Sequence, residues 1–210
     1  MDWLLDSIFY YVYVNGLYYL FSTIMYLFDL FYENKKIQQF SMEIYPKTIP
    51  TILMNTFVYM IPIYLMGGLY NQLDHKVFEW GIAIKDIILC VPLVDLFFYS
   101  FHRLFHLDYF YVYHKKHHEI HAPVGVTALY MNPVDVYFGN VIPIVLPAII
   151  LKVHPYTFYF WIFVTIFNTV CFAHSGYQKI SNFHDGHHSL FNKNYGIDIF
   201  MDRFFGTLKK

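Results

Sequence analysis

The chain has 210 residues, of which 57% are hydrophobic and only 14% are charged, whereas soluble domains usually carry about 25% charged residues. The formal net charge of -1 excludes the strongly basic surface that is typical of nucleic-acid-binding proteins. Length and composition together favour one structural unit that is embedded in a membrane.

Five apolar stretches follow one another along the chain, at residues 4–31, 49–70, 81–101, 134–151 and 156–173. A helix needs about 20 residues to cross a bilayer, so the second and third stretches are long enough, and the second contains no charged residue. The fourth and fifth are joined by only four residues, which predicts a helical hairpin. Asn132-Pro133 is a favourable helix start, because asparagine caps the first turn and proline fits its first position. Core helices of a soluble protein are the alternative interpretation of these stretches.

Basic residues alternate between the connecting segments, and this predicts the orientation in the membrane. The segments after the first, third and fifth stretches carry most of the lysines and arginines, whereas 71–80 carries only Lys76. By the positive-inside rule, the amino terminus is expected outside the cytosol and the carboxyl terminus inside it. Ten of the 12 histidines then share the cytosolic side: His102, His106, His114, His117, His118, His121, His174, His184, His187 and His188.

Nine of these histidines form repeated motifs that are typical of metal ligands. Residues 102–106 form an HxxxH motif, residues 114–118 and 184–188 form two HxxHH motifs, and His174 follows the fifth stretch. Neutral imidazole binds iron, copper and zinc, and one zinc ion needs only three or four ligands. The surplus predicts two metal ions. We therefore expect an all-α integral membrane bundle with a cytosolic histidine-rich cap that holds a dinuclear metal site.

Other residues of the cap have plainer interpretations as well. A histidine-rich surface that faces solvent or lipid headgroups is the alternative for the whole cluster. His121 belongs to no repeated motif, so it is expected either beside the ligands or at the surface. The two cysteines lie in apolar stretches without a CxxC pairing, and we expect them to be buried apolar residues.

The order and context of these motifs resemble the fatty acid hydroxylase superfamily, which includes sterol desaturases and sterol C4-methyl oxidases. The resemblance covers roughly residues 85–207 and rests on the histidine motifs together with Ala122-Pro123-Val124-Gly125-Val126, His174-Ser175-Gly176-Tyr177, Asn194-Tyr195-Gly196 and Met201-Asp202-Arg203-Phe204-Phe205-Gly206-Thr207. It divides the chain into N-terminal transmembrane spans (1–80) and a fatty acid hydroxylase-like domain (81–210), within one structural unit. Within the superfamily, these motifs are most similar to those of the sterol C4-methyl oxidase branch.

The resemblance implies a membrane oxidoreductase that hydroxylates or desaturates a lipid, either a sterol or a fatty acyl chain. It implies two iron ions, which zinc can replace on purification, with O2 as oxidant and an external electron donor. Cytochrome b5 with its NAD(P)H reductase is often that donor. The implied location is the endoplasmic reticulum, with the active site facing the cytosol, and sterol biosynthesis is the implied pathway.

The expected metal ligands are His102, His106, His114, His117, His118, His174, His184, His187 and His188. Glu119 and Asp185 lie next to ligands in the sequence and are candidates to orient imidazoles from behind. Family members often have a histidine where this chain has Asn132, and some have a histidine or an acid where it has Gln178, so Gln178 and His121 are further candidates beside the ligands. Two other functions stay open: a catalytically silent relative with a binding or scaffold role, and a metal transporter, which would place its ligands near the bilayer midplane.

Overall fold

The computed structural model describes residues 2–32, 36, 41–73, 77–177 and 183–209, and the regular structure in these residues is helical. An isolated bridge between Lys36 and Tyr177 is the one strand-like pairing among them. The expected all-helical class is confirmed. In chain order the elements are α1 (Asp2–Tyr32), α2 (Ile44–Met54), η2 (Asn55–Tyr59), α3 (Ile61–Asn71), α4 (Trp80–Phe105), α5 (Tyr111–His114), η3 (His117–Glu119), η4 (Gly125–Leu129), α6 (Pro133–Asp135), η5 (Val136–Val141), α7 (Ile142–Ile150), α8 (Pro155–Asn168), η6 (Thr169–Ala173), α9 (Phe183–Leu190) and α10 (Phe200–Phe204).

Each apolar stretch of the sequence corresponds to one long helical stretch. Three of these are long and apolar enough to cross a membrane: Ile44–Asn71, Pro133–Ile150 and Pro155–Ala173. Many large apolar side chains face outward, and Leu5, Val12, Ile88 and Phe160 are each more than half exposed. Such a surface suits contact with lipid rather than water. The molecule is an integral membrane helical bundle, and membrane crossing by α1 and α4 stays a prediction.

The predicted helix start and hairpin are both confirmed. The Asn132 side chain accepts a hydrogen bond from the backbone N–H of Val134 at 2.9 Å, and Pro133 occupies the first helical position. The hairpin turns between Ile150 at the end of α7 and Pro155 at the start of α8. α6 and α8 therefore each begin with a capping side chain, Asn132 and His154 respectively, followed by proline.

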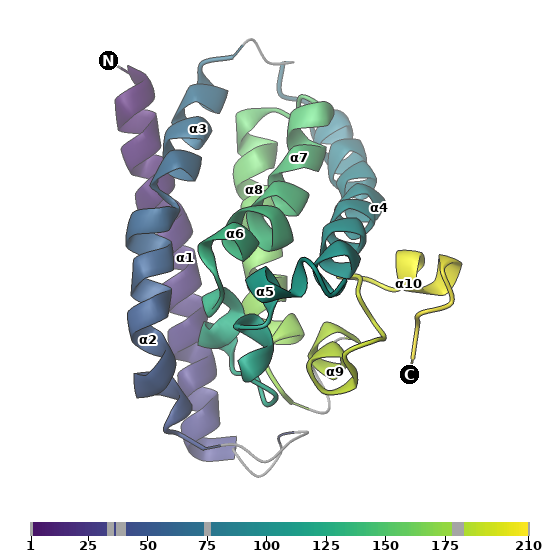
Figure 1. The fold of residues 1–210 in the computed structure, drawn as a ribbon. Coiled ribbons are helices and arrows are strands. Elements are labelled where there is room, and N and C mark those ends of the chain that lie inside the picture. The colour runs from purple at the N-terminus through teal and green to yellow at the C-terminus, as the bar shows by residue number, and fades with distance from the viewer. Residues whose placement is uncertain (1, 33–35, 37–40, 74–76, 178–182, 210) are drawn as a thin grey trace.

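The long helices form three layers (Figure 1). α1 lies beside α2 and α3 on one side, α4 lies on the opposite side, and α7 and α8 lie between them. α1 packs mainly on α3, and α4 packs mainly on α7. The buried apolar core extends through this middle layer, where Val136, Ala148 and Val170 have no exposed surface.

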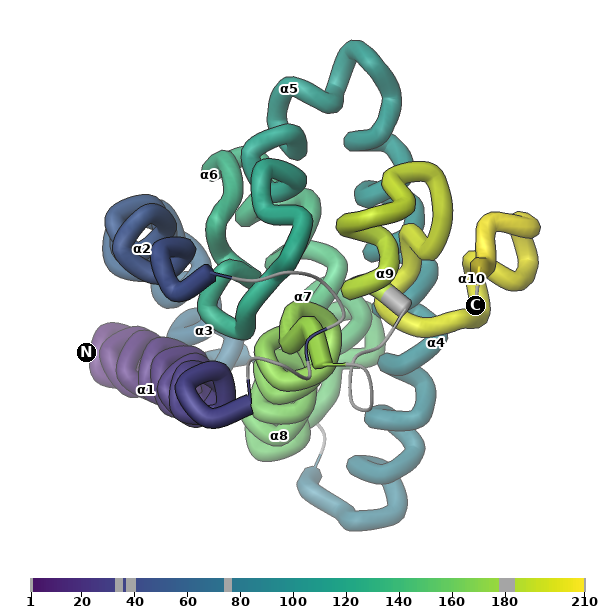
Figure 2. The backbone as a smooth tube through the Cα atoms, turned by 90° about the horizontal axis from the view of Figure 1, so that it is seen from below, coloured from purple at the N-terminus to yellow at the C-terminus, as the bar shows by residue number. Residues whose placement is uncertain are grey.

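Short elements build a cap at the carboxyl end of α4. α5, η3, α9 and α10 gather there (Figure 1), and Figure 2 shows α9 between α4 and α8 with α10 at the outer edge. Three of the connecting elements, η2, η5 and η6, are π-helical, and the last two adjoin this cap. Such turns carry one extra residue and recur at functional sites. Here η5 leads into α7, and η6 ends immediately before His174.

The C-terminal segment is fastened to the cap by two buried aspartates. Asp95 on α4 accepts hydrogen bonds from two backbone N–H groups in residues 198–201, at 2.9 and 2.8 Å. Asp202 accepts two more from residues 195–196, at 2.9 and 2.6 Å. The bonds of Asp95 hold the loop after α9 against α4, those of Asp202 hold the same loop against α10, and Tyr195 of this loop binds His102.

Candidate metal centre

Nine histidines of the cap meet at the carboxyl end of α4. They come from α4 and the residue after it, α5, η3, the residue after η6, and α9. They form two groups, in each of which one ligand atom per histidine lies within 4.8 Å of the others. Group A contains His102, His106, His114, His118 and His187, and group B contains His117, His174, His184 and His188. These are the nine residues that the sequence proposed as ligands, and each group is large enough to hold one metal ion.

Each HxxHH motif contributes to both groups. His114 and His118 belong to group A, while His117 belongs to group B. Adjacent residues on a helical turn point about 100° apart, so two consecutive histidines cannot face the same ion. The second motif is arranged in the same way with the groups exchanged, since His187 alone of its three histidines belongs to group A. The three histidines of one motif have adjacent rings, but their ligand atoms are divided between the two groups.

Within the groups the Nε2 atoms face one another. In group A, His187 Nε2 lies 2.9 Å from His106 Nε2 and 3.2 Å from His118 Nε2. In group B, His174 Nε2 lies 3.3 Å from His117 Nε2. Two imidazoles bound to one ion at about 2.0–2.1 Å have nitrogens roughly 3–3.5 Å apart. Within the described residues, buried Nε2 atoms without a hydrogen-bond partner also occur at His102, His114 and His188. A cation in each group would satisfy these lone pairs together, so the residues fit a metal.

Backbone carbonyls hold the outer nitrogen of five of these rings, and the longest of these contacts is the 3.4 Å between His117 Nδ1 and the Tyr130 carbonyl oxygen. The Nδ1 atoms of His102, His187, His174 and His188 lie 2.7, 2.6, 2.9 and 3.1 Å from the carbonyl oxygens of Tyr195, Lys193, Thr169 and Ile120. Because a carbonyl oxygen only accepts, Nδ1 carries the proton and donates it. Nε2 is then left with its lone pair toward the centre, which is the tautomer that metal binding requires.

A carboxylate holds a sixth ring. His114 Nδ1 lies 2.7 Å from Asp135 Oδ2, and both side chains are buried. Asp135 is the last residue of α6. The π-helical turn η5, which follows it, places Gly139 against the Asp135 carboxylate. A Cβ atom at Gly139 would lie 2.0 Å from Asp135 Oδ1. Only glycine therefore leaves the carboxylate in place to orient His114.

Burial favours the neutral form of many of these rings. Burial lowers the pKa of His174 to about 4 and that of His187 to about 3. Burial, followed by the neighbouring imidazoles, holds the pKa values of His117, His184 and His188 well below the ordinary range. Neutral imidazole is the form that binds a metal. The fold thus presents ready ligands near neutral pH.

The candidates beside the ligands have different positions. Glu119 is exposed and accepts a hydrogen bond from the Tyr130 hydroxyl at 2.9 Å. Asp185 is buried and accepts from the Gly176 N–H at 2.7 Å, so it holds the segment that follows His174. His121 is exposed and lies outside both groups. Gln178 lies outside the described residues. Both cysteines are buried and free, as expected.

The groups that orient the rings from behind, Asp135 and the backbone carbonyls, were not predicted from the sequence. Asp135 follows the Asn132-Pro133 helix start by two residues, so an acid in the first turn of that helix was a usable signal. The carbonyls of Tyr195 and Lys193 left no such signal, because every residue has a carbonyl and only the fold directs it.

Replacing Asp135 is expected to weaken metal binding in group A without removing a ligand. Asp135→Ala frees the His114 ring to rotate, and loss of such a partner typically costs 10–100-fold in metal affinity. Asp135→Asn keeps an acceptor and should cost less. Competition with a chelator measures the affinity, and Glu119→Gln is the matched control because that carboxylate is exposed. Unchanged affinity in Asp135→Ala would show that His114 needs no orienting partner.

A protein-family model matches the part of the chain that contains these histidines. The model of the family described as "Fatty acid hydroxylase" matches residues 87–207, which is more than half of the chain. The chain belongs to the fatty acid hydroxylase family. The matched region starts inside α4 and includes all nine histidines of the two groups, Asp135 and the C-terminal loop behind His102.

Relatives within the family carry different printed activities. The chain is 30% identical over 183 residues to "Fatty acid hydroxylase ahd1" of Mycosarcoma maydis, covering 79% of this chain and 46% of that protein. It is 32% identical over 165 residues to "Very-long-chain aldehyde decarbonylase GL1-11" of Oryza sativa subsp. indica, covering 70% and 60%. It is 33% identical over 141 residues to "Putative methylsterol monooxygenase DDB_G0269788" of Dictyostelium discoideum, covering 60% and 52%.

The chain thus spans about half the length of the curated relatives it matches. No solved structure matches it.

Proposed function

We propose that this chain is a membrane-bound, O2-dependent lipid oxidase, a hydroxylase or desaturase, whose nine histidines hold two iron ions. The observation that carries the proposal is the division of these histidines into two facing groups of five and four. Family membership supports lipid oxidation in general. Iron is proposed over zinc because the reaction needs a metal that changes oxidation state, which zinc does not.

The bound irons would supply the activation of O2 toward a C–H bond. The protein's own residues prepare that chemistry. Asp135 and the backbone carbonyls orient the rings so that their Nε2 atoms face the centre, and burial favours the neutral form of rings such as His174 and His187. Burial of all the rings except the partly exposed His106 keeps bulk water out, which protects reactive species from side reactions.

An apolar cavity leads from the bundle to this centre and is the proposed lipid site. Its volume is about 70 Å³, smaller than typical ligand sites, so a lipid chain enters as the lining side chains move apart. A smaller cavity against the metal centre is lined by His102, His114, His117, His174 and His184. Asn140 and Thr169 line both cavities. A lipid in the apolar cavity would therefore extend a carbon past these two residues toward the histidines.

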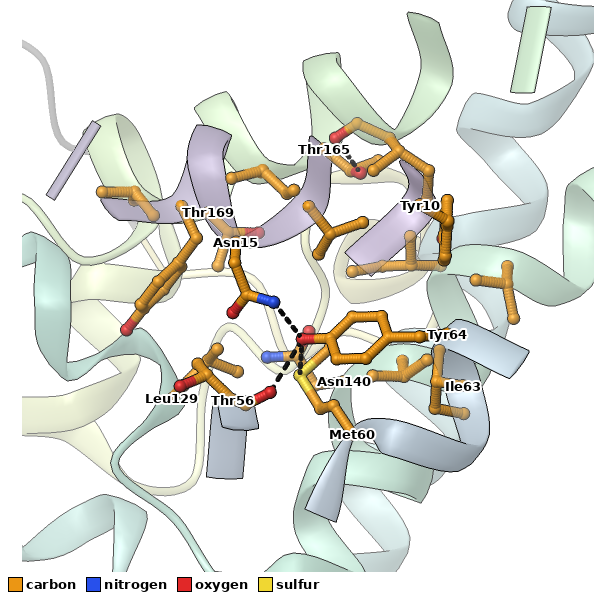
Figure 3. A pocket seen from close by; sticks show the side chains of 18 residues that line it. Tyr10, Asn15, Thr56, Met60, Ile63, Tyr64, Leu129, Asn140, Thr165 and Thr169 are labelled. Carbon is orange, nitrogen blue, oxygen red and sulfur yellow. Dashed lines mark hydrogen bonds between the residues drawn. The ribbon is translucent and has the colours of Figure 1, made fainter. Parts of the chain in front are cut away.

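Polar groups at the middle of the cavity bind one another. The Asn15 side chain donates to the Tyr64 hydroxyl at 3.0 Å, and that hydroxyl donates to the Thr56 carbonyl at 2.9 Å (Figure 3). The Tyr19 hydroxyl and Thr56 Oγ1 pair at 2.7 Å. Because these groups are satisfied by the protein, the cavity surface offered to a ligand is mainly apolar.

The electron donor is proposed to approach the capped face, which we assign to the cytosolic side of the endoplasmic reticulum membrane. Lys115 is exposed there, whereas Lys116 donates to Thr51 Oγ1 at 3.0 Å and lies over the Tyr130 ring. Lys115 is thus the better candidate to attract an acidic donor such as cytochrome b5. Solvation of Lys115 near anionic headgroups remains the alternative interpretation.

Turnover in nanodiscs tests the proposal. Iron-loaded protein with O2, a reductase system and added lipid extract should consume O2 and give lipids that have gained one oxygen atom or lost two hydrogens. Hydroxylation uses two electrons and two protons, and returns the second oxygen atom as water, so label from ¹⁸O2 appears in the alcohol. His187→Ala should lose the activity, and His121→Ala should keep it. Metal-loaded protein that consumes no O2 with any lipid would favour a silent relative.

A further inference from the structure

Three cavities follow one another through the bundle. The cavity at the histidines shares Asn140 and Thr169 with the apolar cavity described above, which we call the inner cavity. The inner cavity in turn shares Tyr10, Ile63 and Val145 with a third one, the outer cavity. The outer cavity continues to Leu73 and Ile149, both of which are exposed. The row therefore runs from the metal centre to the opposite end of α7.

Tyr10 stands where the inner and outer cavities meet, and its ring is held from several sides. Its centroid lies 5.9 Å from that of Phe158 and 6.3 Å from that of Tyr64. Gly67 on α3 provides the space for the ring, since a Cβ atom there would lie 2.3 Å from Tyr10 Cδ1. Only 3% of Tyr10 is exposed. The ring is thus fixed by packing rather than free to swing.

Within the described residues, none of the observed hydrogen bonds involves the Tyr10 hydroxyl. Tyr13 and Tyr18 on the same helix, in contrast, bind backbone carbonyls. The role of Tyr10 therefore rests on where its ring packs, between the inner and outer cavities. An aromatic ring at the boundary between two apolar cavities acts as a wall.

We propose that Tyr10 is the floor of the lipid site and sets how far a single unbranched acyl or alkyl chain reaches beyond the carbon at the metal centre. The proposal rests on the proposed function only in that the ligand is a lipid. Phe158 on α8 beside Tyr10 and Thr169, which directly follows α8 at the metal end, are 11 residues apart, roughly 16 Å at helical rise. A site of that depth accepts a chain of limited length, and Tyr10 determines the limit.

A linear chain suits this row of cavities better than a fused ring system. The inner cavity is bounded by side chains from α1, α3, α7 and α8, and the Tyr10 and Tyr64 rings project into it (Figure 3). A flexible chain can bend around such projections, whereas a rigid tetracycle needs a wide continuous slot.

The test compares chain-length preference in binding, with no turnover. Protein as purified, in detergent and without reductant, is incubated with a spin-labelled fatty acid and displaced by saturated fatty acids from medium to very long chain. Wild type should show affinity that rises with length and then stops rising. Tyr10→Ala should join the two cavities, so the rise continues to longer chains, at about fourfold for each further methylene buried. Tyr10→Phe keeps the ring and is the matched control, with the wild-type limit.

A second measurement does not depend on how a variant folds. In wild-type protein, a fatty acid that carries a diazirine near its methyl end should label Tyr10, Ile63 or Val145. Labelling confined to Leu73 and Ile149, an unchanged length limit in folded Tyr10→Ala, or a sterol that displaces the probe better than every fatty acid would each overturn the proposal. Because binding is read without O2, failed turnover alone would reject the oxidase and leave this result standing.

Discussion

Wild-type protein is expected to hold two metal ions per chain after metal loading, one for each histidine group. His117→Ala combined with His188→Ala should lower this to one ion. The pair removes two of the four histidines of group B and leaves all five of group A in place. Two remaining imidazoles are too few to retain an ion in competition with a chelator. Metal analysis of the purified protein after dialysis against a weak chelator gives the count.

Because each HxxHH motif contributes histidines to both groups, a second pair of substitutions tests the grouping more directly. His184→Ala with His187→Ala removes two residues of one HxxHH motif, one from each group. If each motif held its own ion, this pair would remove one ion and leave the other tightly bound. The structure instead predicts weaker binding of both ions, since each group loses one ligand. His121→Ala is the control, because it is exposed and lies outside both groups.

Absence of metal from well-folded, metal-loaded wild type would contradict the centre altogether and leave a silent relative as the best account. Metal retained by His117→Ala with His188→Ala at the wild-type level would contradict the grouping but not the presence of a centre.

The long helices, and the meeting of the histidines at one end of the bundle, could be predicted from the sequence. Helix start, hairpin and the apolar stretches follow from local patterns, because capping, proline placement and hydropathy are properties of neighbouring residues. The meeting of the nine histidines also follows once the membrane places their segments on one side. Each of these inferences needs only sequence order and the bilayer.

The division of the histidines could not be predicted in the same way. Which of His117 and His118 turns to which group depends on where α5 ends and η3 begins, and such boundaries are the least certain part of sequence interpretation. Asp135 reaches His114 only through the π-helical turn η5 and the space left by Gly139. These details come from packing between segments that are distant in sequence.

A buried ionic cluster around Asp29 is a further feature that the sequence did not predict, and its removal is expected to have the second large effect, on stability. Asp29, near the end of α1, has no exposed surface. Its carboxylate accepts hydrogen bonds from the hydroxyls of Tyr45 and Tyr177 at 2.7 and 2.6 Å, and pairs with Lys36 Nζ at 2.6 Å. Lys36 also donates to the carbonyl of Ser175 at 2.5 Å. One aspartate of the first helix thus fastens the segment that directly follows His174.

Removal of this carboxylate is expected to destabilise the fold strongly. Burial lowers the pKa of Lys36, and the carboxylates of Asp29 and Asp185 oppose that shift. Asp29→Ala leaves the Lys36 ammonium buried without its closest counter-charge and deprives two buried tyrosine hydroxyls of their acceptor. Breaking one side of a buried ion pair typically costs about 3–5 kcal/mol. For a chain of this size, the midpoint of thermal unfolding in detergent should fall by roughly 6–20 °C.

The control is Asp2→Ala, which removes an exposed aspartate from the same helix and should leave the midpoint nearly unchanged. Lys36→Met with Asp29→Asn tests the cause more closely. It removes both charges while keeping much of their volume, and replacement of a buried pair by neutral groups is often tolerated. The double variant should therefore be more stable than Asp29→Ala. If Asp29→Ala and Asp2→Ala unfold at the same temperature, the cluster does not hold the segment at His174 in place, and the support of group B must come from α9 and η6 alone.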